Sequence, residues 1–83
     1  MATFYVMYSA VLQRYYIGHT TEPMDERLRK HLSAHHGWTA RAKDWQVVWC
    51  EQHADKKAAY AREREVKGWK SRTMIEELVT GGR

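Results

Sequence analysis

Two strand-like runs lie very close together near the start of the chain, and they constrain the fold more than any other feature. Residues 3–9 and 14–20 are rich in aromatic and β-branched side chains, which is typical of β-strands. Only residues 10–13 separate them. Antiparallel strands can be joined by so short a loop, whereas parallel strands need a crossover of about a dozen residues or more. The sequence therefore predicts a hairpin and excludes an all-parallel sheet.

A helix is predicted after the hairpin. Thr21 is a candidate N-cap, and Pro23 is tolerated in a first turn. Apolar residues recur every four positions, which predicts a buried stripe of Met24, Leu28 and Leu32. We expect this helix to stop near residues 35–37.

The middle of the chain predicts a loop and a third strand. Residues 38–44 have no clean periodicity and are expected to form the loop. Residues 45–52 predict the strand, in which Trp45, Val47 and Trp49 alternate with the residues between them. Because apolar residues occur on both faces, we expect this strand to be central or covered.

Two further helices are predicted towards the C-terminus. Asp55 is expected to cap a helix that runs through Lys67 and ends at Gly68. Ser71 is expected to cap a last helix, and residues 81–83 to fray. The predicted order is β-β-α-β-α-α, which indicates an α+β fold with a three-stranded, mainly antiparallel sheet flanked by helices. At 83 residues, we expect residues 1–83 to form one domain.

Composition excludes some classes of protein and favours others. No run approaches the roughly 20 apolar residues of a membrane span. No stretch reads as a secretory leader, and the one cysteine, Cys50, cannot form an internal disulfide, so we expect a reducing, cytoplasmic setting. The net charge of +4 favours polyanionic partners but is too small to identify one.

An ordered set of residues points to a family. Tyr5 is followed eleven positions later by Tyr16-Ile17-Gly18, then by Arg27 on a predicted helix and Glu63 on a later one. This order resembles the GIY-YIG endonucleases, in particular the small stand-alone members related to the N-terminal nuclease domain of the bacterial ABC excinuclease. The second motif of the family, Y-I-G, occurs unchanged as residues 16–18. The first departs from the family pattern, because Thr3-Phe4-Tyr5 retains only the tyrosine.

The resemblance implies a role for each site residue. Tyr5 would deprotonate or orient the attacking water, and Tyr16 would support that water and the hydration shell of the metal. Arg27 would bind the scissile phosphate, with His31 beside it on the same helix. Glu63 would hold a single divalent cation, Mg²⁺ or alternatively Mn²⁺, which suits one carboxylate and several waters.

The implied activity is metal-dependent hydrolysis of DNA, with RNA left open as a substrate. It would be structure-selective and linked to DNA repair or recombination, and a partner protein could supply the targeting. The alternatives are a protein-interaction module, or a catalytically inactive nucleic-acid-binding module that keeps the fold. The missing glycine of the first motif and the absence of asparagine motivate the inactive module. Oligomeric state stays open.

Strand geometry supports part of the site independently. If Ser9 pairs with Arg14, Met7 faces Tyr16, and Tyr5 lies on that same face one diagonal step away. Gly18 inside a strand marks close approach of another backbone or a ligand. Arg27 and His31 are four residues apart and should project together.

The role of Tyr5 as a base requires that its pKa be lowered. A tyrosine can act as a base near neutrality only if nearby cations favour the phenolate. The metal, Arg27 and His31 are the candidate cations.

Several alternatives stay open at this stage. Periodicity alone does not decide between Glu63 and Glu65, and only the family resemblance selects Glu63. His31, His35 and His36, with Cys50, could hold zinc, although no C-x-x-C or H-E-x-x-H motif accompanies them. Cys50 is otherwise expected to be a small core residue.

Basic and aromatic residues could track a nucleic-acid backbone. The predicted nucleic-acid-binding residues are Gly18, His19, Arg41, Lys43, Lys67 and Lys70, with Trp38, Arg62, Arg64 and Arg72 as further members. A solvated charged face is the alternative for any one of them.

Overall fold

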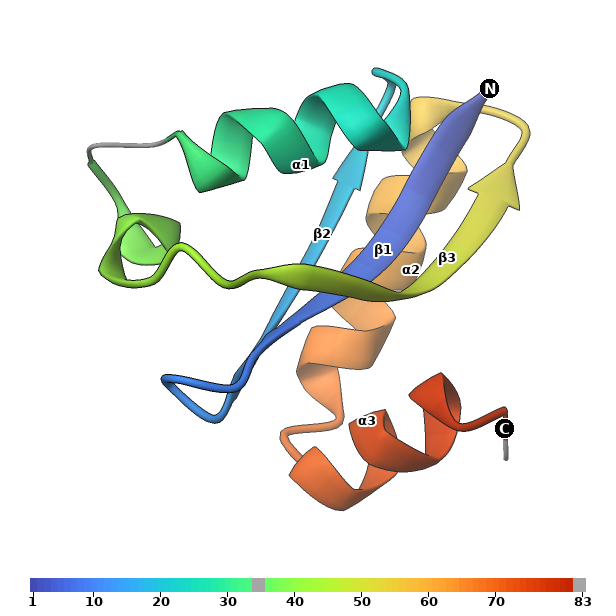
Figure 1. Cartoon of the computed structure of the whole chain (residues 1–83). Coiled ribbons are helices and arrows are strands. Elements are labelled where there is room, and N and C mark those ends of the chain that lie inside the picture. Colours follow the sequence, from blue (N-terminus) through green and yellow to red (C-terminus); the bar gives the residue numbers. More distant parts are fainter. Residues whose placement is uncertain (34–35, 82–83) are drawn as a thin grey trace.

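A three-stranded antiparallel sheet forms the middle layer of the molecule (Figure 1). The structure is a computed structural model that describes residues 1–33 and 36–81. Strands β1 (Ala2–Ser9), β2 (Arg14–Thr20) and β3 (Gln46–His53) are arranged in the order β2-β1-β3. The α+β fold and the predicted element order are confirmed. The central strand is β1, and β3 is an outer strand covered on both faces, which is the second of the two alternatives expected for it.

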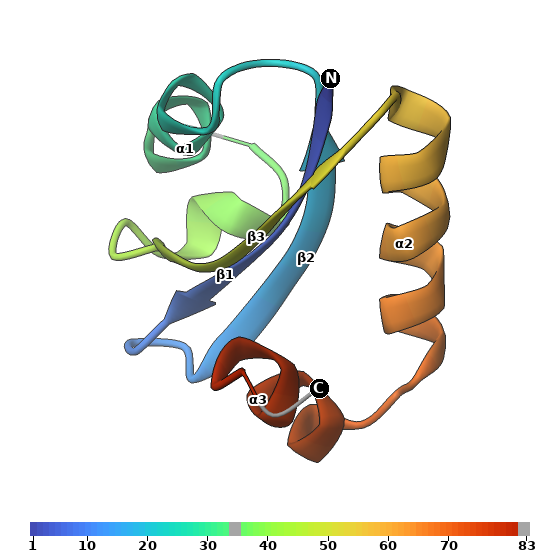
Figure 2. The ribbon, with the colours of Figure 1, turned by 90° about the vertical axis from the view of Figure 1, so that its right-hand side faces the viewer.

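Helices cover both faces of this sheet (Figure 2). Helix α1 (Met24–Leu32) and the 3₁₀ helix η1 (Trp38–Arg41) lie on one face, and we call this the α1 face. Helix α2 (Lys56–Gly68) lies on the other, the α2 face, with α3 (Arg72–Val79) at its lower end. No helix among the described residues has the length and apolar character to cross a membrane.

Alternation along β1 builds one core on each face of the sheet. Phe4 and Val6 are fully buried against Val66 of α2 and Leu78 of α3. Tyr5 and Met7 are fully buried in a second cluster, which the stripe of Met24, Leu28 and Leu32 covers. Since side chains alternate across a strand, one run of eight residues supplies both cores.

The register of the hairpin is the predicted one. Ser9 pairs with Arg14, Met7 with Tyr16, and Tyr5 with Gly18. The rings of Tyr5 and Tyr16 lie on the same face with their centroids 6.3 Å apart. Loop length therefore fixes which face of the sheet receives the two tyrosines.

The hairpin loop lacks glycine and asparagine, and an outside residue holds it. Asp44 accepts hydrogen bonds from Ser9 Oγ (2.6 Å) and from the backbone N–H of Val11 (3.0 Å). Gln13 takes the left-handed conformation, with φ of 53°. Two hydrogen bonds to one carboxylate thus replace the turn chemistry that the loop sequence does not supply.

A bulge changes the predicted alternation of the third strand. Val6 pairs with Trp49 and Met7 with Val47, so Val48 has no partner in the register. As a result Val48 and Trp49 both pack towards the α2 face, while Val47 packs towards the α1 face. The strict alternation expected for residues 45–52 was wrong, but the strand is covered on both faces.

The N-terminal caps of two of the three α-helices are the ones that the sequence predicts. The side chains of Asp55 and Ser71 accept hydrogen bonds from Ala58 N and Met74 N, so both predicted caps are confirmed. The first helix is different. Pro23 occupies its N-cap without a side-chain hydrogen bond, so the predicted Thr21 cap was wrong.

Two boundaries also differ from the prediction. The first helix ends at Leu32, before the expected residues 35–37, of which 35 lies outside the described residues. The expected loop over residues 38–44 contains η1. The indole N–H of the buried Trp45 donates to Thr39 O at 2.9 Å, so a long-range contact orders a segment that has no periodicity. Of the tail that was expected to fray, residues 82–83 lie outside the described residues.

Gly18 lies beneath the end of the Tyr5 side chain. A Cβ placed at position 18 would lie 2.7 Å from Tyr5 Oη and 2.8 Å from Tyr5 Cζ. The close approach that the sequence predicted is therefore real, but a side chain makes it rather than a backbone or a ligand. A residue larger than glycine would displace a fully buried ring.

We expect Gly18→Ala to destabilise the fold by about 1–3 kcal/mol, because the added methyl group overpacks a rigid aromatic contact. Urea unfolding measures the change. Gly68→Ala is the matched control, since nothing lies within 4 Å of the position its Cβ would take and it ends a helix, so stability should stay equal or rise slightly. Equal stability of Gly18→Ala and the wild type would contradict the close contact.

Candidate active site at the outer edge of the sheet

The hydroxyl of Tyr5 is the centre of a hydrogen-bonded cluster on the α1 face. Its Oη lies 2.8 Å from His31 Nε2 and accepts a hydrogen bond from Arg27 Nε at 3.3 Å. Because Arg27 can only donate, the phenol proton is the one available to His31 Nε2. His31 Nδ1 then carries its own proton and lies 3.2 Å from Thr39 Oγ1. Each polar atom of this buried chain has a partner.

Tyr16 lies against the same cluster. Its ring centroid is 4.9 Å from that of His31, in an edge-on arrangement. The structure thus brings together Tyr5, Tyr16, Arg27 and His31, which the sequence placed in two strands and a helix. Arg27 and His31 reach one atom from successive turns of α1, as their spacing predicts.

The electrostatics of this cluster differ from the expectation. Burial raises the pKa of Tyr5 above its usual value and outweighs the opposite effect of Arg27. Burial, helped by the nearby Arg27 charge, lowers the pKa of His31. His31 is therefore a neutral imidazole near pH 7 rather than a cation, and Tyr5 is a protonated phenol. The prediction that His31 helps to stabilise a phenolate was wrong.

A carboxylate lies on the opposite face. Glu63 of α2 has a side chain only 12% exposed, and its oxygens lie 2.7 Å from His19 Nδ1 and 2.9 Å from Lys67 Nζ. Glu65 points outwards, is 58% exposed and pairs with Arg62. Packing thus distinguishes the two glutamates, which periodicity could not do, and Glu63 is the inward one.

The Glu63 carboxyl is ionised. Burial alone would raise its pKa, but the hydrogen bonds from His19 and Lys67 together lower it below the usual range. Lys67 is the more exposed of the two partners, at 54% against 18% for His19. An ionised carboxylate with one exposed partner has the chemistry to bind a hard divalent cation that keeps several waters.

The site has two halves, the Tyr5 cluster on the α1 face and Glu63 on the α2 face. They meet at the outer edge of β2, which is the edge that does not pair with β1. Gly18 lies under the Tyr5 ring on the α1 face, and the next residue, His19, bonds to Glu63 on the α2 face. The negative charge of Glu63 is close enough to contribute to the raised pKa of Tyr5. A phosphate at this edge can therefore approach groups from both faces.

The zinc alternative receives no support from the described residues. No group of three or more histidine, cysteine, aspartate or glutamate side chains in residues 1–33 and 36–81 is placed to hold a metal. His31 bonds to Tyr5 and Thr39, and His35 lies outside the described residues. Cys50 is exposed on β3, so its predicted place in the core was wrong.

Only part of the predicted nucleic-acid surface gathers at the site. Three of the predicted residues lie at the site: Gly18, His19 and Lys67. Arg41 and Lys43 are exposed near the end of η1. Lys70 lines a separate pocket of about 270 Å³ with Arg14 and Arg72, at the far end of β2.

Arg62 departs most from the predicted role in nucleic-acid binding. Its guanidinium donates to both oxygens of Glu51 and lies over the rings of Phe4 and Trp69. It therefore ties α2 to β3 instead of facing a ligand. Arg64 is exposed, and its guanidinium lies over the Tyr60 ring.

Sequence analysis missed two partnerships in the site. Thr39 accepts from the far nitrogen of His31, and His19 holds Glu63 across 44 residues of sequence. No local sequence pattern predicts either contact. The sequence predicts Trp38 only as a further member of the nucleic-acid-binding set, whereas its ring stacks on Tyr16 with the two centroids 6.2 Å apart.

Comparison with known proteins agrees with this geometry. The family model described as the GIY-YIG catalytic domain matches residues 1–76. No curated protein and no solved structure gave a significant match. The matched segment covers every strand, α1, α2 and all the residues of the site. It implies nuclease-type activity, nucleic acid as substrate and, in general, use of divalent metal ions. We conclude that the chain belongs to the GIY-YIG family of endonuclease domains.

Proposed function

We propose that this protein is a metal-dependent endonuclease that hydrolyses phosphodiester bonds in DNA. The observation that carries the proposal is the Tyr5, His31 and Arg27 cluster, which faces Glu63 across the outer edge of β2. Hydrolysis of a phosphodiester needs a deprotonated water and a counter-charge at the phosphoryl oxygens. The cluster and the carboxylate supply the groups for both.

Tyr5 and His31 move the proton of the attacking water. Tyr5 Oη takes this proton while its own proton passes along the 2.8 Å hydrogen bond to His31 Nε2. The neutral imidazole is the form that can accept it. Thr39 holds the ring in the required tautomer through Nδ1, and Arg27 stabilises negative charge on the phenol oxygen.

Arg27 also binds the scissile phosphate. Its Nε donates to Tyr5, and its Nη1 lies 3.8 Å from Glu22 Oε1, a long and one-third exposed ion pair that a phosphate would replace. A guanidinium in this position places the phosphate next to the water that Tyr5 orients. Planar paired donors suit phosphate oxygens, so lysine would be a poor replacement.

Glu63 is the residue that would hold a divalent cation, and Mg²⁺ is the proposed ion, with Mn²⁺ as the alternative. When bound, the ion would neutralise charge on the phosphate and on the leaving oxygen. His19 bonds to Glu63 and would orient its carboxylate, and Tyr16 would support the attacking water and the hydration shell of the ion. Lys67, which now bonds to Glu63 at 2.9 Å, would give up this hydrogen bond to a bound cation.

The departure from the first family motif leaves this site intact. Phe4 fills the core on the α2 face, and Thr3 Oγ1 accepts a hydrogen bond from Gln52. Phe4 lies on the face opposite Tyr5, Thr3 shares the face of Tyr5 but bonds to Gln52, and the register of Tyr5 with Gly18 is regular. This supports an active enzyme over the inactive binding module.

The cellular role is also part of the proposal. We propose residues 1–83 as one catalytic domain that acts in the cytoplasm on branched, flapped or nicked DNA, in repair or recombination. The net charge of +4 suits a polyanionic substrate. Comparing DNA with RNA of the same sequence tests the preferred backbone.

We expect Arg27→Ala and Glu63→Gln to lower cleavage of branched DNA in Mg²⁺ by about 10²–10³-fold each, since each removes charge stabilisation of the transition state. Gel assays with labelled DNA measure cleavage. Arg29→Ala and Glu65→Gln are the matched controls, because each lies two residues away on the same helix and is exposed. The controls should cleave at the wild-type rate.

Two results would contradict the proposal. The first is no cleavage of branched, flapped or nicked DNA with Mg²⁺ or Mn²⁺, and salt-sensitive binding in that case would indicate the inactive module. The second is cleavage that persists in EDTA or that responds equally to the site variants and their controls.

The pH profile tests the proton path. His31 must be neutral, so kcat/KM should fall only as the pH drops through a His31 pKa that lies below the usual 6.5. The pKa of Tyr5 lies above the usual 10, so the profile should stay flat from about pH 7 to pH 9.

Substitution of His31 completes this test. His31→Gln should lose the acidic limb of the profile and about 10²–10⁴-fold in rate. His36→Gln, an exposed histidine near η1, is the control and should behave as wild type. A rate that keeps rising towards pH 10 would show instead that the phenolate itself is the base.

A further inference from the structure

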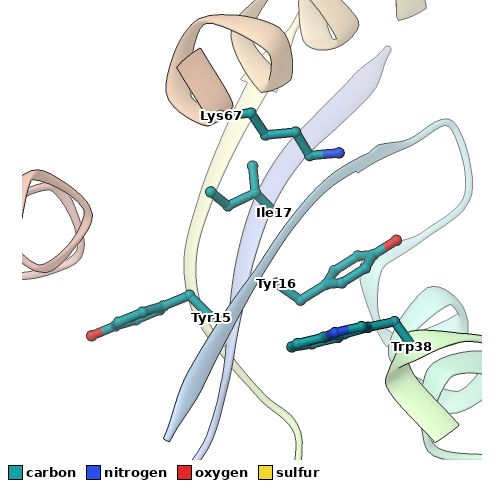
Figure 3. A pocket seen from close by; sticks show the side chains of 5 residues that line it. All are labelled: Tyr15, Tyr16, Ile17, Trp38 and Lys67. Carbon is teal, nitrogen blue, oxygen red and sulfur yellow. The ribbon is translucent and has the colours of Figure 1, made fainter. Parts of the chain in front are cut away.

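An aromatic pocket opens on the outer edge of β2, between the two halves of the site (Figure 3). It has a volume of about 250 Å³ and is lined by Tyr15, Tyr16, Ile17, Trp38 and Lys67. Trp38 is 39% exposed, which is unusual for so large an apolar side chain. The proposed chemistry above does not use this ring.

The Trp38 ring is held in place rather than loosely exposed. It stacks on Tyr16 at an interplanar angle of 29° and lies 5.3 Å from the buried Trp45, measured between ring centroids. Trp45 is anchored by its hydrogen bond to Thr39 O. A fixed, partly exposed indole is a prepared surface for a second flat ring.

A cation completes the pocket. Lys67 approaches from α2, on the face of β2 where Tyr15 and Ile17 lie, while Tyr16 and Trp38 lie on the other face, so the pocket spans the edge of the strand (Figure 3). An aromatic surface with a positive charge beside it is the chemistry that binds a nucleotide, because the base stacks and the phosphate pairs with the cation. Small apolar ligands would not need the lysine.

We propose that this pocket binds an unpaired nucleobase of the nucleotide next to the scissile phosphate, with the base on Trp38. The inference rests on the proposed function and names its substrate class. Tyr16 lies in both the pocket and the catalytic cluster, and Lys67 bonds to Glu63, so the bound nucleotide is continuous with the reacting phosphate.

Selectivity for DNA structure follows from this assignment. Bases inside a continuous duplex are paired and stacked, so their faces cannot reach Trp38 without an energetic cost. Bases in flaps, gaps and frayed junctions are already unstacked. The pocket therefore selects substrates with an unpaired nucleotide at the cleavage position, without reading their sequence.

Binding to two oligonucleotides of equal charge tests the proposal. Fluorescence anisotropy in EDTA measures the affinity for a labelled single strand and for the same strand with abasic sites. The wild type should bind the intact strand roughly tenfold more tightly than the abasic strand, the effect of one stacked base. Trp38→Ala should weaken binding of the intact strand but not of the abasic strand. The ratio of the two affinities should therefore fall to about one.

Two further variants keep the result interpretable. Trp38→Phe should retain most of the wild-type ratio, because phenylalanine still stacks. Tyr60→Ala is the matched control, since Tyr60 is also a strongly exposed aromatic, at 46%, and lines the separate pocket of about 650 Å³ with His19, Lys56 and Lys57. It should keep the wild-type ratio, and circular dichroism confirms that all variants fold.

The outcomes separate this inference from the proposed function. A ratio that is unchanged in Trp38→Ala, or lowered as much in Tyr60→Ala, overturns the base pocket even if the protein cleaves DNA. Failure to cleave any DNA overturns the proposed function, while the binding ratio in EDTA still tests the pocket.

Discussion

The contact of the Tyr5 phenol with Gly18 is the constraint on which both the fold and the site depend. The ring is fully buried, so its hydroxyl must find hydrogen-bond partners inside the protein. Gly18 has no side chain, and the phenol therefore extends over β2 towards its outer edge. His31 and Arg27 meet it there and tie α1 to the sheet. The hydrogen bonds that complete the core are the same ones that assemble the candidate active site.

Burial also decides the chemistry of this cluster. A low-dielectric site disfavours both the phenolate and the imidazolium, which raises one pKa and lowers the other. The stable resting state is a neutral pair joined by a short hydrogen bond. Such a pair can pass a proton without first creating an isolated buried charge, which is costly. The catalytic role proposed for Tyr5 therefore depends on its histidine partner.

The sequence predicts those features that depend on local spacing. A four-residue loop fixes the hairpin register, and the register alone puts Tyr5 and Tyr16 on one face. The features it misses depend on contacts between distant residues. Asp44 replaces absent turn chemistry, the bulge at Val48 breaks the alternation, and His19 singles out Glu63 from Glu65. Asp44 and His19 lie far along the chain from the residues they contact, and the bulge depends on how β3 pairs with β1.

The position of the site at an edge strand has a further physical consequence. An outer strand presents unpaired backbone N–H and C=O groups, which invite pairing with another chain. Here the outer edge of β2 is flanked by Trp38 on one face and by Lys67 on the other. A bulky ring and a charged side chain obstruct an added β-strand, yet both suit a nucleotide. The side chains that flank this edge are thus the same ones on which the proposed nucleotide pocket depends.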